Sequence, residues 1–306
     1  MKEIKIFTPA TVANISCGFD ILGLCLDTVG DEMIVREVPE KGIRLTKITG
    51  QELPLETHKN VAGVAGLALL EQVDASVGYE IEIYKKIKPG SGIGSSAASA
   101  AGAVFAINEL LGKPFSKQEL IYFAMQGEKL ASGTEHADNV SPVILGGFTL
   151  VRSYKPLDVL KINSPDNLYA TIIHPQIEVK TSDSRAVLKN QVSLKKMVTQ
   201  MGNFGGLISG LYTNNYDLIG RSLHDEIIEP NRLVLIPEFD KVKKGVIQAG
   251  ALGAGISGSG PSIFALSKGK ETANIVGETM AEIYNTTDID YDIHVSKINQ
   301  QGIKIL

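Results

Sequence analysis

A glycine-rich segment followed by serines carries the strongest chemical signal in the chain. It spans Pro89-Gly-Ser-Gly-Ile-Gly-Ser-Ser-Ala-Ala98, between a predicted strand and a predicted helix. Glycines at alternate positions let the backbone turn tightly and approach a ligand without obstruction by a Cβ atom. The next helix begins with unpaired N–H groups and the positive end of its dipole. The segment therefore predicts a phosphate-binding loop, in which Ser95 and Ser96 cap the helix, hold a phosphate oxygen or ligate Mg²⁺. An ordinary glycine loop before a serine-capped helix is the alternative.

A second polar segment lies near the N-terminus, between Pro9 and Asp20. Asn14 and Asp20 place an amide and a carboxylate on a loop that also contains Gly18. Such a pair can bind an ammonium or hydroxyl group of a substrate. Alternatively, both side chains form hydrogen bonds with their own backbone in a turn, which is frequent for Asn and Asp.

A third segment, from Gly253 to Ser262, contains a formal GxGxxG pattern. A dinucleotide-binding loop requires these glycines to open a helix. Here Gly260-Pro261 and an apolar run follow, which predict a turn and then a strand. We therefore expect a strand-to-strand loop that supports phosphates or a neighbouring loop. An NAD-dependent oxidoreductase is a distant alternative.

These three segments need an α+β scaffold to bring them together. Strands are predicted over 4–7, 19–26, 32–37, 43–47, 79–84, 147–152, 169–174 and 290–295, with further strands flanking the turn within 254–266. Helices are predicted over 60–72, 95–111, 115–130, 193–212, 218–224, 239–249 and 271–284. The strands cluster between helices, which favours α+β over a doubly wound sheet. At 306 residues the chain exceeds the usual size of one core, so we expect two domains, 1–150 and 151–306.

Composition excludes several classes of protein. The chain is 43% apolar and 21% charged, with a net charge of −4, which is typical of a soluble globular protein and disfavours nucleic-acid or membrane partners. The two cysteines, Cys17 and Cys25, cannot form a disulfide framework, so we expect a reducing, cytoplasmic location. The histidines show no zinc-site spacing. The oligomeric state stays open, a homodimer included.

Together, the order and spacing of the three segments resemble the motifs of the GHMP kinase superfamily, and the likeness extends over the whole chain. Mevalonate-type members carry a lysine two residues after the first proline, where this chain has Thr11. The string from Ala13 to Gly23 is more similar to the homoserine kinase family. The resemblance implies an N-terminal lobe like the second domain of ribosomal protein S5, with a left-handed βαβ crossover. It also implies a ferredoxin-like C-terminal lobe and an active site between the two.

The resemblance implies ATP-dependent phosphorylation of the L-homoserine hydroxyl to O-phospho-L-homoserine, a step of threonine biosynthesis. Residues that it assigns to ATP are Asn60, Pro89, Gly90, Ser91, Gly92, Ile93, Gly94, Ser95, Ser96, Ala97, Ala98 and Ser99. Mg²⁺ is expected at Ser96 and Glu128, which offer the hard oxygen ligands that it prefers.

Homoserine is a zwitterion, and other segments offer groups of matching charge. Arg185 and Arg232 lie in segments that resemble the family's substrate-arginine segments and can bind its carboxylate through guanidinium forks, although single arginines are usually solvated surface residues. Candidate partners of its ammonium group are Asp20, Asn14 and His136.

The catalytic candidates are Asp138, Asn139 and Glu128. The residue order does not decide whether Asp138 or Asn139 faces the substrate hydroxyl. A mechanism without a dedicated base is also compatible with a loose phosphoryl-transfer transition state. Two further alternatives stay open, a GHMP kinase acting on mevalonate or a sugar and a non-catalytic GHMP-fold binding protein.

Overall fold

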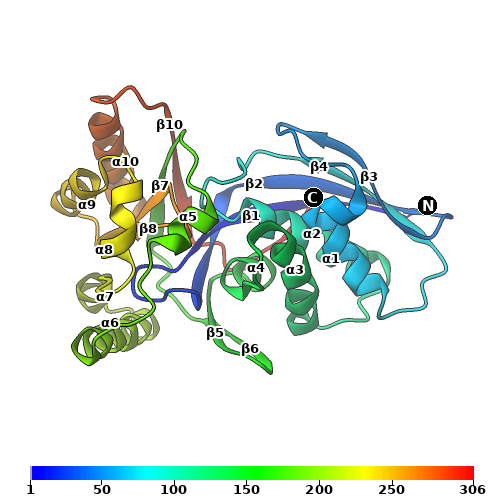
Figure 1. Ribbon diagram of the computed structural model, residues 1–306, viewed down its shortest axis with the longest axis horizontal. Helices are drawn as coiled ribbons and strands as arrows, with labels where there is room; N and C mark the ends of the chain where they lie inside the picture. Colours follow the sequence, from blue (N-terminus) through cyan, green and yellow to red (C-terminus); the bar gives the residue numbers. More distant parts are fainter. Residues whose placement is uncertain (1) are drawn as a thin grey trace.

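Two α+β halves lie side by side in the computed structural model, which describes residues 2–306 (Figure 1). The first half contains, in chain order, β1 (Glu3–Ala13), β2 (Leu22–Val38), β3 (Gly42–Thr49), the 3₁₀ turn η1 (Thr57–Lys59), α1 (Val61–Leu70), β4 (Gly78–Tyr84), α2 (Ser95–Leu110), α3 (Lys117–Ser132), α4 (Ala137–Leu145), β5 (Phe148–Tyr154) and β6 (Leu157–Ile162). The second contains β7 (Leu168–Pro175), α5 (Thr181–Ala186), α6 (Leu194–Tyr212), α7 (Tyr216–Ser222), α8 (Glu229–Arg232), η2 (Leu233–Leu235), α9 (Phe239–Gln248), β8 (Gly253–Ile256), β9 (Ile263–Lys268), α10 (Lys270–Tyr284) and β10 (Tyr291–Lys297). The short β11 (Lys304–Ile305) then returns to pair with β1. The α+β class predicted from the sequence is confirmed.

Within these residues, the first sheet has seven strands. Its central order is β11-β1-β2-β4-β3, and β5 pairs with both β2 and β6. β3 and β4 are parallel and are connected through α1, whereas β1, β2 and β4 are antiparallel neighbours. In β4, Tyr79, Ile81 and Ile83 are buried and alternate with partly exposed residues, so one face of the sheet carries the core. Helices α1 to α4 pack together beside this sheet (Figure 1).

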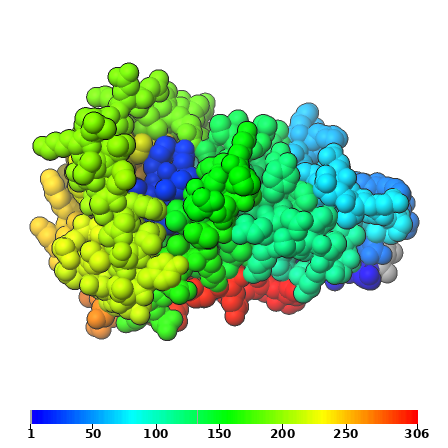
Figure 2. All heavy atoms as spheres, turned by 90° about the horizontal axis from the view of Figure 1, so that it is seen from below, coloured from blue at the N-terminus to red at the C-terminus, as the bar shows by residue number. Residues whose placement is uncertain are grey.

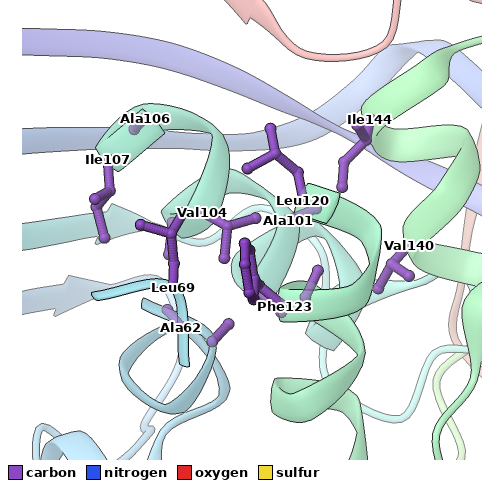
Figure 3. Close-up of a cluster of buried hydrophobic side chains, with 14 of the residues drawn as sticks. Ala62, Leu69, Ala101, Val104, Ala106, Ile107, Leu120, Phe123, Val140 and Ile144 are labelled. Atoms are coloured by element: carbon purple, nitrogen blue, oxygen red, sulfur yellow. The ribbon is translucent and has the colours of Figure 1, made fainter. Parts of the chain in front are cut away.

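The helix that follows the glycine loop, α2, lies at the centre of the first half. Nearly all of its residues are buried, because its many alanines let neighbouring elements approach from every side. Figure 3 shows Ala101 and Val104 of α2 beside Leu69 of α1 and Phe123 of α3, with Val140 of α4 nearby. The N-terminus of α2 is therefore held in place by packing along the whole helix.

The second sheet is antiparallel, with the order β10-β7-β9-β8. Adjacent residues of β7 point to opposite faces of the sheet and belong to different hydrophobic clusters. Ile172 packs with Leu207 of α6 and Ile219 of α7, whereas Ile173 packs with Val246 of α9 and Val276 of α10. Helices therefore cover both faces of this sheet.

The two halves share one hydrophobic cluster. Val12, Ile15 and Leu24, from β1, β2 and the loop between them, pack with Ile172 and Phe264 of the second sheet. In Figure 1 this blue loop reaches the neighbourhood of α6 and α8. Figure 2 shows blue atoms between green and yellow-green atoms of later segments. The polar segment near the N-terminus is thus brought to the second half.

One strand differs clearly from its prediction. The sequence predicts two strands, over 19–26 and 32–37, but β2 runs without a break from Leu22 to Val38. Gly30, which suggested a turn, lies inside the strand. A Cβ atom there would come within 2.5 Å of the Phe7 ring and the Thr8 carbonyl. Pairing of β2 with β1, β4 and β5 overrides the local turn signal.

Several short elements were not predicted, among them α4, α5, α8 and β6. Helix α4 contains Pro142, which has no N–H to donate to the carbonyl of Asp138 four residues earlier. That carbonyl lies against Gly23 of β2, 1.9 Å from where a Cβ atom would stand. The proline and the glycine together allow α4 to lie very close to β2.

The domain boundary near residue 150 stays a prediction. Residue 150 lies within β5, and the β5–β6 hairpin keeps the chain on the first sheet as far as Ile162. No helix within residues 2–306 has the length and apolar character needed to cross a bilayer.

Candidate active site

The predicted phosphate loop connects β4 to α2 and has the conformation that its glycines suggest. Gly90, Gly92 and Gly94 have φ values of 73°, 81° and 72°, a region that disfavours residues with a Cβ. At Gly92 a Cβ would also lie 2.7 Å from the carbonyl oxygens of Ser257 and Gly260. This position therefore accepts only glycine.

The glycine-rich segment 253–262 forms hydrogen bonds with the backbone of the predicted phosphate loop. The hydroxyl of Ser257 donates to the carbonyl of Gly92 (2.7 Å), and that of Ser262 donates to the carbonyl of Ser91 (2.6 Å). The segment runs from β8 through a turn into β9 and opens no helix. The expected strand-to-strand loop is confirmed, and the geometry of a dinucleotide-binding loop is absent from this segment.

A cavity of about 530 Å³ lies beside the loop. The predicted ATP residues that line it are Asn60, Pro89, Gly90, Ser91, Gly92, Gly94, Ser95, Ser96 and Ser99. Ile93, Ala97 and Ala98 do not line it, because their side chains are packed in the hydrophobic clusters. The hydroxyl of Ser91 is buried and has no hydrogen-bond partner among residues 2–306. A polar ligand in the cavity would satisfy it.

Two of the lining residues have structural bonds of their own. Asn60 caps α1, because its Oδ1 accepts from the N–H of Ala62 (3.0 Å), and its Nδ2 donates to the carbonyl of Pro54 (2.8 Å). The hydroxyl of Ser95 donates to the carbonyl of Ile87 (3.0 Å), across the base of the loop. Of the two serines at the start of α2, Ser95 therefore has its hydroxyl engaged within the loop itself.

Lys85 is a cavity residue that the sequence analysis missed. Its ammonium group is buried, pairs with Asp31, and donates to the carbonyl of Ser95 (3.0 Å) and the hydroxyl of Ser99 (3.2 Å). Burial lowers the pKa of Lys85, and the Asp31 carboxylate opposes that shift. Lys85 follows a predicted alternating strand and lies next to two further basic residues, so nothing in the sequence distinguished it from a lysine exposed to solvent.

Glu128 of α3 faces the same cavity and is buried. Burial raises its pKa to about 7, while a hydrogen bond with Ser96 and the charge of Lys85 act in the opposite direction. Two oxygen donors of the kind that bind Mg²⁺ are thus in contact at the start of α2. Among residues 2–306 no cluster of three or more His, Cys, Asp or Glu side chains forms a metal cage.

A smaller pocket of about 90 Å³ adjoins the large cavity. It is lined by all five predicted substrate residues and both candidates for the base: Asn14, Asp20, His136, Arg185, Arg232, Asp138 and Asn139. Residues that line both cavities are Asn139, Thr181, Arg185, Gly258 and Ser259. The two cavities therefore share a wall.

Three charged or polar side chains form one side of the small pocket. Nη2 of Arg185 donates to both carboxylate oxygens of Asp20 (3.0 and 3.1 Å) and lies 3.0 Å from Nε2 of His136. Burial lowers the pKa of His136, the nearby guanidinium groups lower it further, and Asp20 opposes them. The imidazole is therefore neutral at pH 7 and can accept a hydrogen bond from Arg185.

Arg232 also lines this pocket and is 3% exposed. Its Nε donates to the carbonyl of Ser184 and its Nη1 to that of Gly258, both at 3.0 Å. Its guanidinium lies 5.0 Å from the centre of the Phe19 ring, which the sequence analysis did not single out. Burial lowers the pKa of Arg232 to about 10, so the group keeps its charge at neutral pH.

The turn that carries Asn14 is under backbone strain. Asn14, Ile15 and Ser16 have φ values of 72°, 40° and 57°, which are costly for residues other than glycine and most of all for a β-branched one. Asn14 stabilises the turn with its amide, since its Oδ1 accepts from the N–H of Asp20 (3.0 Å) and its Nδ2 donates to the carbonyl of Gly258 (2.7 Å). Both functional groups of Asn14 thus already have partners.

The two candidates for the base differ in their surroundings. Asn139 lines both cavities, and its Oδ1 accepts from the hydroxyl of Thr11 (2.9 Å). Asp138 lines only the small pocket and is 3% exposed. Burial raises the pKa of Asp138 to about 7, and the charges of Asp20 and Glu128 act in the same direction.

Comparison with known proteins agrees with this geometry. The family model for the GHMP kinases N terminal domain matches residues 59–147, and the one for the GHMP kinases C terminal domain matches residues 207–286. A homoserine kinase of Chlorobium phaeobacteroides strain BS1 is 46% identical over 320 residues, covering 100% of both chains. One of Methanococcus vannielii is 40% identical and covers 93% of this chain and 94% of its own.

Solved structures agree as well. A crystal structure of homoserine kinase from Cytophaga hutchinsonii is 52% identical, has a TM-score of 0.96, and covers 100% of this chain and 98% of its own. A mevalonate kinase of L. major has the same fold at 16% identity, with a TM-score of 0.72 over 96% of both chains. The chain therefore belongs to the GHMP kinase superfamily and, within it, to the homoserine kinase family.

Proposed function

We infer that the chain transfers the γ-phosphoryl group of ATP to the side-chain hydroxyl of L-homoserine, forming O-phospho-L-homoserine for threonine biosynthesis. The shared wall between the two cavities carries this inference. A phosphoryl group from the large cavity and a hydroxyl group from the small one would meet beside Asn139 and Thr181. Phosphoryl transfer depends mainly on such positioning and on neutralisation of charge. The homoserine kinases of similar sequence support the choice of substrate.

The paired charges in the small pocket support a zwitterionic substrate. Arg185 and Asp20 are bonded to each other in the absence of substrate. Homoserine would exchange this pair for two new ones, its carboxylate on Arg185 and Arg232 and its ammonium on Asp20. His136 would accept a further hydrogen bond. We expect Asn14 to act mainly by holding the turn, because its amide is already bonded.

For the metal, we propose that Ser96 and Glu128 would hold Mg²⁺ beside the phosphate loop. Their hydroxyl and carboxylate groups lie in contact beside the phosphate loop, and both are ligands that Mg²⁺ prefers. The ion would supply neutralisation of the phosphate charge. The buried Lys85 adds a fixed positive charge at the same end of the cavity.

For proton transfer, we propose that Asn139 orients the hydroxyl and Asp138 receives its proton. A raised pKa near 7 suits a general base at neutral pH. The turnover of Asp138→Asn tests this role. A base of this kind contributes about 10²–10⁴-fold to the rate, so a loss well below 10²-fold would favour a mechanism without a dedicated base.

A cytoplasmic location is also proposed, supported by the two free, buried cysteines. The homodimer stays a prediction.

The direct test of function is an ATP-consumption assay with the purified chain. L-Homoserine, mevalonate, galactose and shikimate are offered separately, with and without Mg²⁺. We expect turnover with homoserine only and only with the metal. Clear turnover of another alcohol, with none for homoserine, would assign the chain a different substrate within the superfamily.

A further inference from the structure

The N-terminal half of α6 is attached to the rest of the molecule by one buried polar side chain. Among residues 194–201 only Gln200 is buried, and neighbours such as Val198 are exposed. The C-terminal half of α6 is anchored differently, by Leu207 and Leu211 in the shared hydrophobic cluster. The bonds of Gln200, together with the one that Asn203 donates to the carbonyl of His224, therefore hold the first half of this helix in place.

Every polar atom of the Gln200 amide has a partner. Its Nε2 donates to the carbonyl of Cys17 (3.2 Å) and to Oδ1 of Asp225 (2.9 Å), and its Oε1 accepts from the N–H of Glu226 (2.9 Å). The Asp225 carboxylate also accepts from the backbone N–H groups of residues 227–229, at 2.9 to 3.0 Å. Three segments of the chain meet at these two side chains.

Each of the three segments continues into the small pocket. Cys17 belongs to the turn that carries Asp20. Asp225 holds the start of the segment that runs into α8 and Arg232. Helix α6 itself follows α5, which carries Arg185. The buried amide of Gln200 thus connects the segments that carry Asp20, Arg185 and Arg232. It does so from outside the pocket, since Gln200 lines neither cavity.

We propose that Gln200 is a positioning residue for the amino-acid substrate, acting through Cys17 and Asp225 on the spacing of the three charged side chains. The proposal rests on the proposed function. Removing the amide leaves the carbonyl of Cys17 without its donor and Asp225 with one bond fewer, and frees the first half of α6 to shift. Because both arginines must reach one carboxylate, displacements of about 1 Å weaken binding.

The first test compares Gln200→Met with wild type in steady-state kinetics. Methionine keeps the length of the side chain and removes its donor and acceptor. We expect the KM for homoserine to rise about tenfold, as for loss of a hydrogen bond to a charged group, and the KM for ATP to change less than about twofold. The matched control is Thr199→Val, which removes an exposed hydroxyl on the same helix that donates within the helix to the carbonyl of Lys195 (3.2 Å). It should leave both KM values unchanged.

A second variant covers the case in which Gln200→Met does not fold. Gln200→Asn keeps the amide but is one methylene too short to reach both partners, so we expect a smaller rise in the same KM. An equal rise in the two KM values, or a variant that folds and binds homoserine like wild type, overturns the positioning role. Wild type that never phosphorylates homoserine overturns the proposed function instead, so the two failures are distinguishable.

Discussion

The large cavity, which we assign to ATP, and the small pocket, which we assign to homoserine, share a wall, yet they are built from different parts of the chain. The nucleotide side is largely backbone, because its loop is one continuous segment whose shape is set by three glycines with positive φ. The substrate side consists of charged and polar side chains from four separate segments: Asp20, His136, Arg185 and Arg232. A loop that binds its ligand through the backbone (a backbone cradle) accepts few residue types at each position. A pocket of side chains divides its task among several residues and should lose function in smaller steps.

The largest effect is expected at the tightest point of the cradle. Gly92→Val places a branched side chain where a Cβ already lies 2.7 Å from two carbonyl oxygens, so the loop must move by about 1 Å or more. We expect loss of measurable ATP binding in calorimetry and a fall in turnover beyond about 10²-fold. The control, Gly112→Ala, has a similar φ of 85° but open space around it, so it should lose about 1–2 kcal/mol of stability to backbone strain and still bind ATP like wild type. A folded Gly92→Val protein that binds ATP like wild type would refute the backbone cradle.

The next effect tests a side chain on the nucleotide side. Glu128→Gln removes the charge that we assign to Mg²⁺, so kcat should fall by about 10²-fold and half-maximal activity should need more Mg²⁺. Titration of activity with Mg²⁺ measures both. Glu119→Gln is the control, because Glu119 lies on the same helix in an exposed capping box and should affect stability only slightly. An unchanged Mg²⁺ dependence for Glu128→Gln would contradict its role as a ligand.

Smaller, selective effects are expected in the substrate pocket. Arg185→Leu and Arg232→Leu should each raise the KM for homoserine at least about tenfold, with little change in the KM for ATP. Arg185→Lys should restore only part of the affinity, since an ammonium group cannot form a two-pronged contact. Arg152→Leu, on the exposed part of β5, is the neutral control. If Arg185→Leu raised the KM for ATP equally, the two regions could not be treated as separate.

The smallest effect concerns stability. The pKa of Asp138 is about 7 in the folded protein against 3.8 ordinarily, so between about pH 4 and pH 7 the folded state holds a proton that the unfolded state has released. The free energy of unfolding therefore falls as pH rises through this window. Asp138→Asn cannot bind this proton, so its free energy of unfolding should not fall in this way. Relative to wild type, it should rise by about 1–3 kcal/mol between pH 5 and pH 8. Urea unfolding at both pH values measures the gain. Parallel pH dependence in the two proteins would contradict it.

The contrast between the regions also explains what could be predicted from sequence. The tight glycine turn before α2, α2 itself and α3 follow from local chemistry, and the structure confirms all three elements, whereas phosphate binding by the loop stays a prediction. The lining of the small pocket was anticipated through resemblance to a family. No local pattern shows that Asp20 and Arg185, 165 positions apart, form an ion pair.

Other features depended on contacts that the sequence does not display. Lys85 reads as one of several basic residues after a strand, and only the fold buries it against Asp31. Helix α4 was missed because Pro142 suggests a break, whereas the freed carbonyl of Asp138 lies against Gly23. Lys85 lines the large cavity and Asp138 lines the small pocket. Tertiary contacts most often override local sequence preferences at functional sites of this kind.

The hydrophobic cluster shared by the two halves has a consequence for how the protein unfolds. Each half encloses a hydrophobic cluster of its own, but Val12 and Ile15 belong to a third cluster that they share with Ile172 and Phe264. A fragment ending near residue 150 would leave this apolar surface in water. Melting of the second sheet would equally release the turn that carries Asp20. Unfolding of one half should therefore destabilise the other, and a ligand bound at the junction would stabilise both halves against heat.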